Sequence, residues 1–170
     1  MTTTVLHRTT IGTPAGAVVL VRRAAKLVAL VYEDRWKEMR GELEKRFGAV
    51  SLKPDPDGGA PADAFRRYLS GDLRALESVE VDTDGTPFQE RVWRVLRRIP
   101  PGRTISYAEL ARAVGSPSAV RAVAGANARN PVSIVVPCHR VIAADGALAG
   151  YGGGVPRKEW LLVHEGARFL

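Results

Sequence analysis

The stretch SYAELARAVGSPSAVRAVAGANARNP, residues 106–131, decides how the second half of this chain folds. Ser106 and Glu109 have the spacing of a capping box, which predicts a helix that Gly115 ends after about two turns. Ser116 is predicted to cap a second helix, with a proline in its first turn. Two short helices joined by a short turn that contains glycine are typical of a helix-turn-helix.

The second helix of this pair carries mainly small side chains, so it can approach another backbone closely. Its small residues include Ala119, Ala122, Ala124, Gly125 and Ala126. Such a helix is common in a tightly packed core, but Arg121 and the basic charge around it favour contact with DNA. Reading bases in the major groove normally takes several Arg, Asn or Gln side chains on one face. A single arginine among alanines and glycines better suits binding in the minor groove.

The segment TPFQERVWRVLRRI, residues 86–99, precedes this pair and carries start signals of its own. Thr86 and Gln89 form another capping box, and Pro87 suits the first helical position. The predicted apolar face consists of Phe88, Val92, Val95 and Ile99. Another face carries Arg91, Arg94 and Arg98. This arginine stripe is either a solvated face or a surface for a polyanion.

The charge is distributed unevenly along the chain. Residues 1–85 contain 13 basic and 13 acidic residues, whereas residues 86–170 contain 12 basic and five acidic residues. The whole net charge of +7 therefore lies in the second half, where 11 of the basic residues are arginine. A one-sided arginine excess is typical of a protein that binds nucleic acid. Ordinary solubility charge is the alternative interpretation.

The first half is predicted to form a neutral α/β lobe, residues 1–83, and the second half a separate domain, residues 84–170. The predicted elements of the first lobe are a hairpin over 16–33, a helix over 36–47 ended by Gly48, a loop over 53–64, a helix over 62–70 and a strand over 78–82. A hydrophobic content of 45% is enough for a buried core.

Several classes of protein are excluded by simple patterns. The chain has no run of 18 apolar residues, so no membrane span is predicted, and its N-terminus lacks the pattern of a secretory signal. One cysteine supports neither an internal disulfide nor a cysteine-rich zinc site. The three histidines, His7, His139 and His164, are too scattered to indicate a metal site, and no cofactor is predicted.

The single cysteine lies in VVPCHRVI, residues 135–142. The valines predict a buried, rigid strand, in which Cys138 is either an inert small hydrophobe or a nucleophile. Reactivity needs a nearby base or positive charge, and His139 and Arg140 follow at once. Adjacent residues of a strand point to opposite faces, so a water is expected to bridge Cys138 and His139.

The segment after this motif adds candidate site residues. Tyr151 is followed by three glycines, which let a backbone approach a ligand closely. A helix is predicted from Pro156, with Trp160, Leu161 and His164 on or near its inner side. Glu165 at its end is either an ordinary surface charge or the acid that orients a histidine.

These motifs resemble one family closely. PCHRVI, preceded by RNP and followed by GYGGG, KEWLL and HEG, resembles the O6-alkylguanine-DNA alkyltransferases over residues 86–166. The resemblance implies a ribonuclease-H-like α/β lobe followed by a mostly helical lobe with a helix-turn-helix. It also implies DNA repair by direct reversal, in which the protein irreversibly takes an alkyl group from O6-alkylguanine, or from O4-alkylthymine, in one turnover per molecule.

The resemblance assigns a role to each matching residue. Cys138 accepts the alkyl group, His139 takes the thiol proton through a water, and Glu165 holds His139. Tyr107 donates a proton toward the flipped guanine. The predicted DNA contacts are Arg121, which enters the base stack, with Ser106, Ala119, Ala122 and Gly125. The predicted pocket residues are Val141, Tyr151, Gly152 and Asn130, with the Cys138 and Val141 carbonyls receiving the guanine amine. Some relatives have serine where this chain has Gly152, which offers only its N–H.

The expected partner is double-stranded DNA that contains alkylated guanine, bound by a cytoplasmic monomer with no metal, cofactor or membrane contact. Two alternatives use the same residues differently. A DNA-binding module without transfer activity resembles relatives that lack the cysteine, so Cys138 argues against it. A thiol hydrolase using Cys138, His139 and Glu165 leaves the basic second half unexplained.

Overall fold

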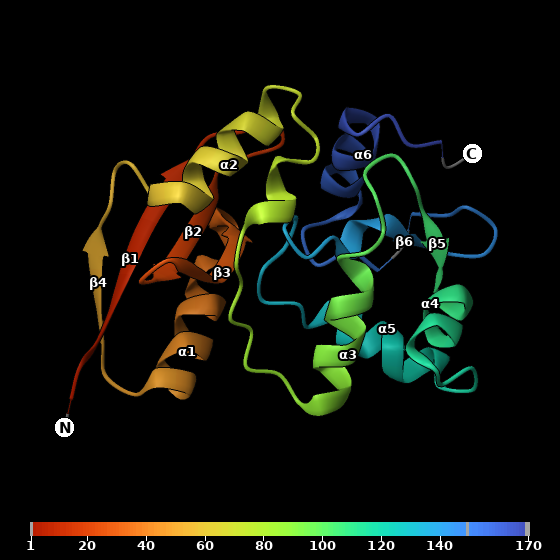
Figure 1. The fold of residues 1–170 in the computed structure, drawn as a ribbon, viewed down its shortest axis with the longest axis horizontal. Coiled ribbons are helices and arrows are strands. Elements are labelled where there is room, and N and C mark those ends of the chain that lie inside the picture. Colours follow the sequence, from red (N-terminus) through yellow and green to blue (C-terminus); the bar gives the residue numbers. More distant parts are fainter. Residues whose placement is uncertain (1, 149, 169–170) are drawn as a thin grey trace. The chain divides into compact units, whose positions relative to one another are not determined.

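The computed structural model describes residues 2–148 and 150–168. The chain divides into two compact units, Met1–Asp82 and Thr83–Leu170. Helices and strands occur in both units, in agreement with the predicted α/β class (Figure 1).

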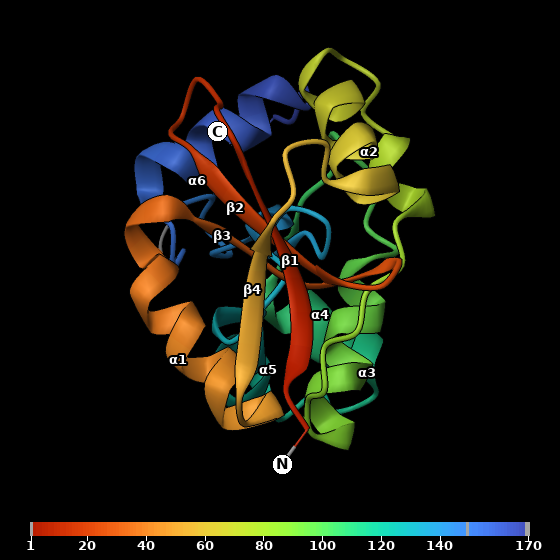
Figure 2. The same cartoon turned by 90° about the vertical axis from the view of Figure 1, so that its left-hand side faces the viewer.

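The first unit is built on one mixed sheet with the strand order β3-β2-β1-β4. Its strands are β1 (Thr4–Ile11), β2 (Val18–Arg23), β3 (Lys26–Tyr32) and β4 (Val50–Pro54). The predicted hairpin is confirmed, because β2 and β3 pair antiparallel. β1 pairs antiparallel with β2 and parallel with β4, which lies beside it in Figure 2. Neither β1 nor β4 was predicted, because the pairing between them joins distant segments.

Helix α1 (Trp36–Phe47) follows a 3-10 turn, Glu33–Arg35, and confirms the second predicted element. Gly48 ends it with a φ of 73°, a left-handed conformation that glycine adopts without a steric cost. Leu43 is buried with Leu6 and Val19 of the sheet. Burying a leucine side chain stabilises a fold by about 1.5–3 kcal/mol.

Two predictions for the first unit are wrong. Helix α2 (Gly59–Leu69) begins inside the predicted 53–64 loop, and β4 also reaches into it. The remaining connection is tied down, because Asp55 forms a 2.8 Å ion pair with Arg22 and its carbonyl accepts the Thr9 hydroxyl. The predicted strand over 78–82 is a 3-10 turn, Ala75–Ser78, followed by an isolated bridge between Val81 and Leu27.

The second unit contains α3 (Pro87–Leu96), α4 (Tyr107–Val114), α5 (Val120–Ala128) and α6 (Val155–His164). Both predicted capping boxes are present, at Thr86 with Gln89 and at Ser106 with Glu109. Gly115 ends α4 with a φ of 87°, as predicted.

The start of α5 differs from the prediction. Ser116 does not cap this helix, whose first residue is Val120 and whose N-cap, Ala119, makes no side-chain cap bond. The Ala119 N–H instead donates to the Ser116 carbonyl at 2.9 Å, so residues 116–119 form a separate turn. The connection between α4 and α5 is therefore longer than the sequence indicated.

The buried face of α3 also differs from the prediction. Val92, Trp93 and Leu96 are buried, whereas Val95 is half-buried and the helix ends before residue 97. Trp93 joins α3 to α5, since its indole N–H donates to the Ala126 carbonyl at 2.9 Å. A Cβ added at Gly85 would clash with the Trp93 ring, so only glycine fits there.

A short parallel ladder places the start of α4. β5 (Ile105–Ser106) pairs with β6 (Val141–Ile142), with Ile105 opposite Val141. Because α4 begins directly after β5 and β6 directly follows Arg140, this pairing sets Tyr107 beside the PCHR segment.

Candidate active site

Cys138 lies in a 3-10 turn, Cys138–Arg140, and not in the strand that the valines predicted. Pro137, with a φ of −82° and a ψ of 67°, turns the chain, and its carbonyl accepts the Arg140 N–H at 3.0 Å. Side chains of such a turn do not alternate between two faces, so the expected opposition of Cys138 and His139 does not apply. The cysteine is 6% exposed and free.

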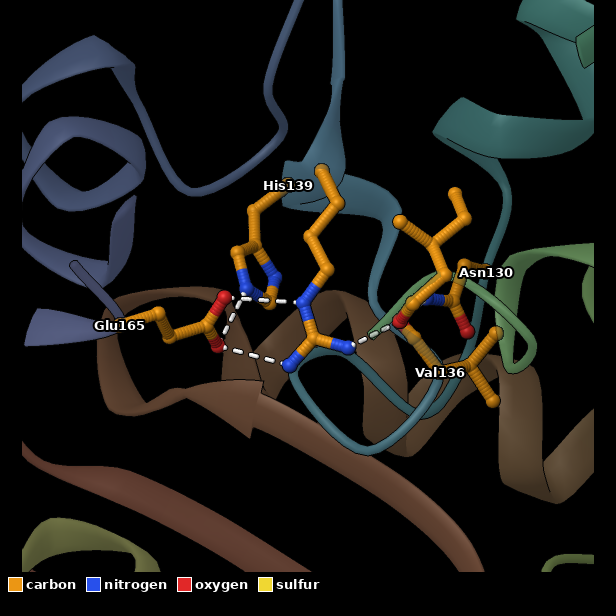
Figure 3. Close-up of polar contacts among 6 residues, drawn as sticks. Asn130, Val136, His139 and Glu165 are labelled. Atoms are coloured by element: carbon orange, nitrogen blue, oxygen red, sulfur yellow. Dashed lines mark hydrogen bonds and ion pairs between the residues drawn. The ribbon is translucent and has the colours of Figure 1, made fainter. Parts of the chain in front are cut away.

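A buried network joins this turn to the end of α6 (Figure 3). His139 Nε2 lies 2.9 Å from Glu165 Oε2, and both side chains are fully buried. Arg140 binds the same carboxylate with two bonds, Nε to Oε1 at 2.8 Å and Nη2 to Oε2 at 2.9 Å. Its Nη1 donates to the Ile99 carbonyl at 2.6 Å. Glu165 is therefore no surface charge, and the part that Arg140 plays was not predicted.

The protonation of the network follows from these contacts. Burial alone would raise the pKa of Glu165, but His139 and the Arg140 guanidinium outweigh it and hold this pKa well below its ordinary value. Burial also lowers the pKa of His139, against the pull of Glu165, so the ring is neutral near pH 7. An ionised carboxylate only accepts hydrogen bonds, so the neutral ring carries its proton on Nε2. Nδ1 is then the basic nitrogen, and it has no hydrogen-bond partner within residues 2–148 and 150–168.

Asn130 fixes the chain that leads into the turn. Its side-chain amide donates to the Val136 carbonyl at 2.7 Å (Figure 3). Its side-chain oxygen accepts the Val132 N–H at 2.9 Å. The segment it spans includes Ile134, whose φ is 72°. A positive φ is unfavourable for a β-branched residue, so the surrounding bonds must hold this conformation.

The thiol of Cys138 is protonated at rest. Burial raises its pKa, while a hydrogen bond from Asn130 and the charge of Lys158 lower it in part. Lys158 on α6 is fully buried, and its ammonium donates to the Val141 carbonyl at 2.6 Å. Sequence reasoning missed Lys158, because a lysine is almost never buried unless it is paired. A protonated thiol needs a base to become a nucleophile.

Tyr107 lies near the thiol. Its pKa is raised by burial first and then by the charge that Cys138 carries when it forms a thiolate, so the phenol keeps its proton. A Cβ added at Gly150 would lie 3.1 Å from the Tyr107 hydroxyl, which shows how closely that backbone approaches it.

The structure brings together four of the predicted site residues, Cys138, His139, Glu165 and Asn130, with Tyr107 next to them. Val141 follows directly in β6 and is buried.

The remaining predicted residues lie on other segments. Arg121, Ala122 and Gly125 are exposed on α5, and Ala119 is half-buried at its N-cap. Ser106 uses its hydroxyl as the cap of α4.

The glycine loop precedes α6. Tyr151 is half-buried, and its carbonyl accepts the Gly154 N–H at 3.0 Å. Gly152 is exposed.

The described part of the chain lacks a metal cluster and a membrane-spanning helix. It contains no cluster of His, Cys, Asp and Glu side chains that could hold a metal ion. Its helices include none with the length and apolar character needed to cross a membrane.

Comparisons with known proteins agree on one family. Residues 87–167 match the model described as the DNA binding domain of 6-O-methylguanine DNA methyltransferase. A methylated-DNA–protein-cysteine methyltransferase of Salmonella typhimurium is 46% identical over 139 residues, which cover 82% of this chain and 81% of that protein. The crystal structure of the Mycobacterium tuberculosis O6-methylguanine methyltransferase has a TM-score of 0.80 at 40% identity, covering 95% of this chain and 93% of that one. The structure of Mycobacterium tuberculosis OGT in complex with DNA has a TM-score of 0.79 at 41% identity, covering 94% and 92%.

Proposed function

Since this chain belongs to the methylated-DNA–protein-cysteine methyltransferase family, we propose that Cys138 is the residue that accepts the alkyl group. The function is DNA repair by transfer of an alkyl group from O6-alkylguanine in DNA to a cysteine of the protein. The observation that carries the assignment is the position of the chain's one cysteine, next to the buried His139–Glu165–Arg140 network.

The transfer is a direct displacement. The sulfur of Cys138 attacks the alkyl carbon, the bond between that carbon and O6 breaks, and a thioether forms. The thiol proton passes to Nδ1 of His139, through a bridging water, while Glu165 keeps the ring in the required tautomer. The base leaves as guanine after it has gained one proton, which the phenol of Tyr107 delivers. The Tyr107 phenol is supported in this role by its proximity to the thiol and by the proton that it holds before the reaction.

The site requires an extruded base, because a thiol cannot reach O6 inside a duplex. We assign α4 and α5 as a helix-turn-helix that lies in the minor groove. Arg121 fills the space that the flipped guanine leaves, which offsets part of the unstacking cost. Ala119, Ala122 and Gly125 permit a close approach of α5, and Ser106 stands at the start of α4.

The flipped base enters a pocket bounded by Tyr151, with the Gly152 N–H as a donor and the Val141 carbonyl as an acceptor. Asn130 keeps the floor of this pocket in place through its bonds to Val136 and Val132. Tyr151 and Gly152 belong to the loop that precedes α6, which also supplies the close approach of Gly150 to Tyr107.

The product limits each molecule to one turnover, because water does not release an alkyl group from a thioether. The first unit, with its mixed sheet and covering helix, is proposed to be ribonuclease-H-like. A free acceptor thiol favours a reducing compartment such as the cytoplasm, and we propose that the protein works there as a monomer without a cofactor.

Mass spectrometry tests the proposal. The protein is incubated with a duplex that contains one O6-methylguanine and is then digested. The peptide that contains Cys138 should gain one methyl group, in proportion to the protein present, and Cys138→Ala should gain none. Methylation of the Ala variant, or repeated turnover by the wild type, would overturn the assignment of Cys138.

A further inference from the structure

A buried amide lies next to the proposed acceptor and takes no part in the proposed reaction. Asn127 is in the last turn of α5 and is 3% exposed. Its Nδ2 donates to the carbonyl of Cys138, with a distance of 3.4 Å. Its Oδ1 is buried and has no hydrogen-bond partner among the residues that the structure describes. Leaving a polar atom buried and unsatisfied costs about 1–3 kcal/mol, so such an atom calls for an explanation.

Both neighbouring carbonyls already accept hydrogen bonds within the protein. The Val141 carbonyl accepts the Lys158 ammonium at 2.6 Å, a bond that takes one of its two lone pairs. The Cys138 carbonyl accepts the Val141 N–H and the Asn127 amide, which uses both of its lone pairs. Oδ1 of Asn127 is therefore a free acceptor beside the Cys138 carbonyl, in addition to the remaining lone pair of the Val141 carbonyl.

The chemistry of the substrate identifies the group that this acceptor would bind. An O6-alkylguanine has no hydrogen on N1, because the alkyl group fixes the base in its lactim form. Its N3, N7 and O6 are acceptors, and N9 carries the sugar. The 2-amino group is thus the one N–H donor that the base offers.

We propose that Oδ1 of Asn127 accepts a hydrogen bond from the 2-amino group of the extruded base and so contributes to the choice of guanine. This inference rests on the proposed function. The 3.4 Å contact to Cys138 is long for a hydrogen bond, so this bond holds the amide only weakly in its present position.

Deleting each partner separately tests the pairing. The substrates are two identical duplexes, one with O6-methylguanine and one with O6-methylhypoxanthine, which lacks only the 2-amino group. The variant is Asn127→Leu, which keeps the size of the side chain and removes the acceptor. The measured quantity is the ratio of the second-order rate constants for methyl transfer to Cys138 from the two duplexes. Because both rates come from one preparation, the fraction of active protein cancels.

We expect this ratio of guanine to hypoxanthine to fall about 2- to 10-fold in Asn127→Leu, the range for one neutral hydrogen bond. If Asn127→Leu does not fold, Asn127→Ser, whose hydroxyl is too short to reach, should show the same fall. An unchanged ratio in a folded variant would overturn the inference.

A third measurement separates base recognition from a role at the thiol. Alkylation of Cys138 by iodoacetamide involves no base and should be unchanged in Asn127→Leu. Equal losses with iodoacetamide and with both duplexes would show that Asn127 positions the thiol, and the inference would fail. Failure of the proposed function looks different, since the wild type would then take no methyl group from either duplex.

Discussion

Replacing Arg140 with methionine should destabilise the protein strongly, because it removes three buried hydrogen bonds at once. Two of them hold Glu165, at 2.8 and 2.9 Å, and the third reaches the Ile99 carbonyl at 2.6 Å. Removing one partner of a buried ion pair costs about 3–5 kcal/mol. A native protein is stable by only about 5–15 kcal/mol, so Arg140→Met should lose about a fifth or more of that.

The loss should depend on pH in a defined direction. The folded pKa of Glu165 is depressed, so this carboxylate contributes stability above its unfolded value of about 4.5, and the contribution disappears as the pH falls through the folded pKa. In Arg140→Met the part of the depression that comes from Arg140 is gone, whereas the part that comes from His139 remains. The difference between wild type and variant should therefore be greatest near pH 7 and shrink as the pH falls below 4.5.

Urea unfolding, followed by tryptophan fluorescence at several pH values, measures this difference. Arg94→Met, an exposed position on α3, is the matched control and should change the free energy of unfolding by no more than about 0.5 kcal/mol. Arg140→Lys keeps the charge but loses the two-bond contact of the guanidinium with the Glu165 carboxylate. Its loss in free energy of unfolding should lie between those of Arg140→Met and Arg94→Met. A difference under about 1 kcal/mol at pH 7, or one that stays constant into acid, would refute the role given to Arg140.

Three further predictions follow from the site and its supports. The rate of methyl transfer should hold as the pH falls to 6.5 and decline only below it, because burial lowers the pKa of His139 and the neutral ring is the base; a midpoint above 6.5 in rates measured from pH 5 to 8 would contradict this. Arg121→Ala should slow the repair of a methylated duplex far more than the reaction with free O6-benzylguanine, and equal losses in the two rates would exclude insertion into the stack. Ser106→Ala removes the cap of α4 and should lower the free energy of unfolding by about 1 kcal/mol, which urea unfolding measures. An unchanged free energy of unfolding would contradict the role of the Ser106 hydroxyl as a stabilising cap.

Local signals in the sequence predicted several elements correctly. The capping boxes at Thr86 and Ser106 are readable because their partners lie three residues away. Gly115 is equally local. Ser116 misled the prediction because serine followed by proline suits the first turn of a helix and an isolated turn alike. Only the packing of the whole connection decides between them.

Nonlocal partners explain what the sequence could not provide. Arg140 donates hydrogen bonds to Ile99 and Glu165, which are 41 and 25 residues away in the sequence. No local spacing of residues therefore predicts these bonds. Lysines are usually exposed, so the sequence gives no reason to expect that Lys158 is buried. Its partner is a backbone carbonyl, which no sequence motif identifies. The local sequence left two interpretations of Glu165 open, and only the resemblance of the HEG motif to a known family favoured the one in which it holds His139.

Ile134 has a consequence for anyone who redesigns this protein. Its φ of 72° would ordinarily call for glycine, yet the side chain is 2% exposed. The left-handed conformation costs about 1–2 kcal/mol, whereas burying an isoleucine gains about 1.5–3 kcal/mol. The gain from burying the side chain thus exceeds the cost of the backbone conformation. A design program that scores torsion angles alone would replace the residue with glycine. A glycine at position 134 would remove the backbone strain but leave a void in the core. That void would lie three residues before Pro137, which turns the chain toward Cys138.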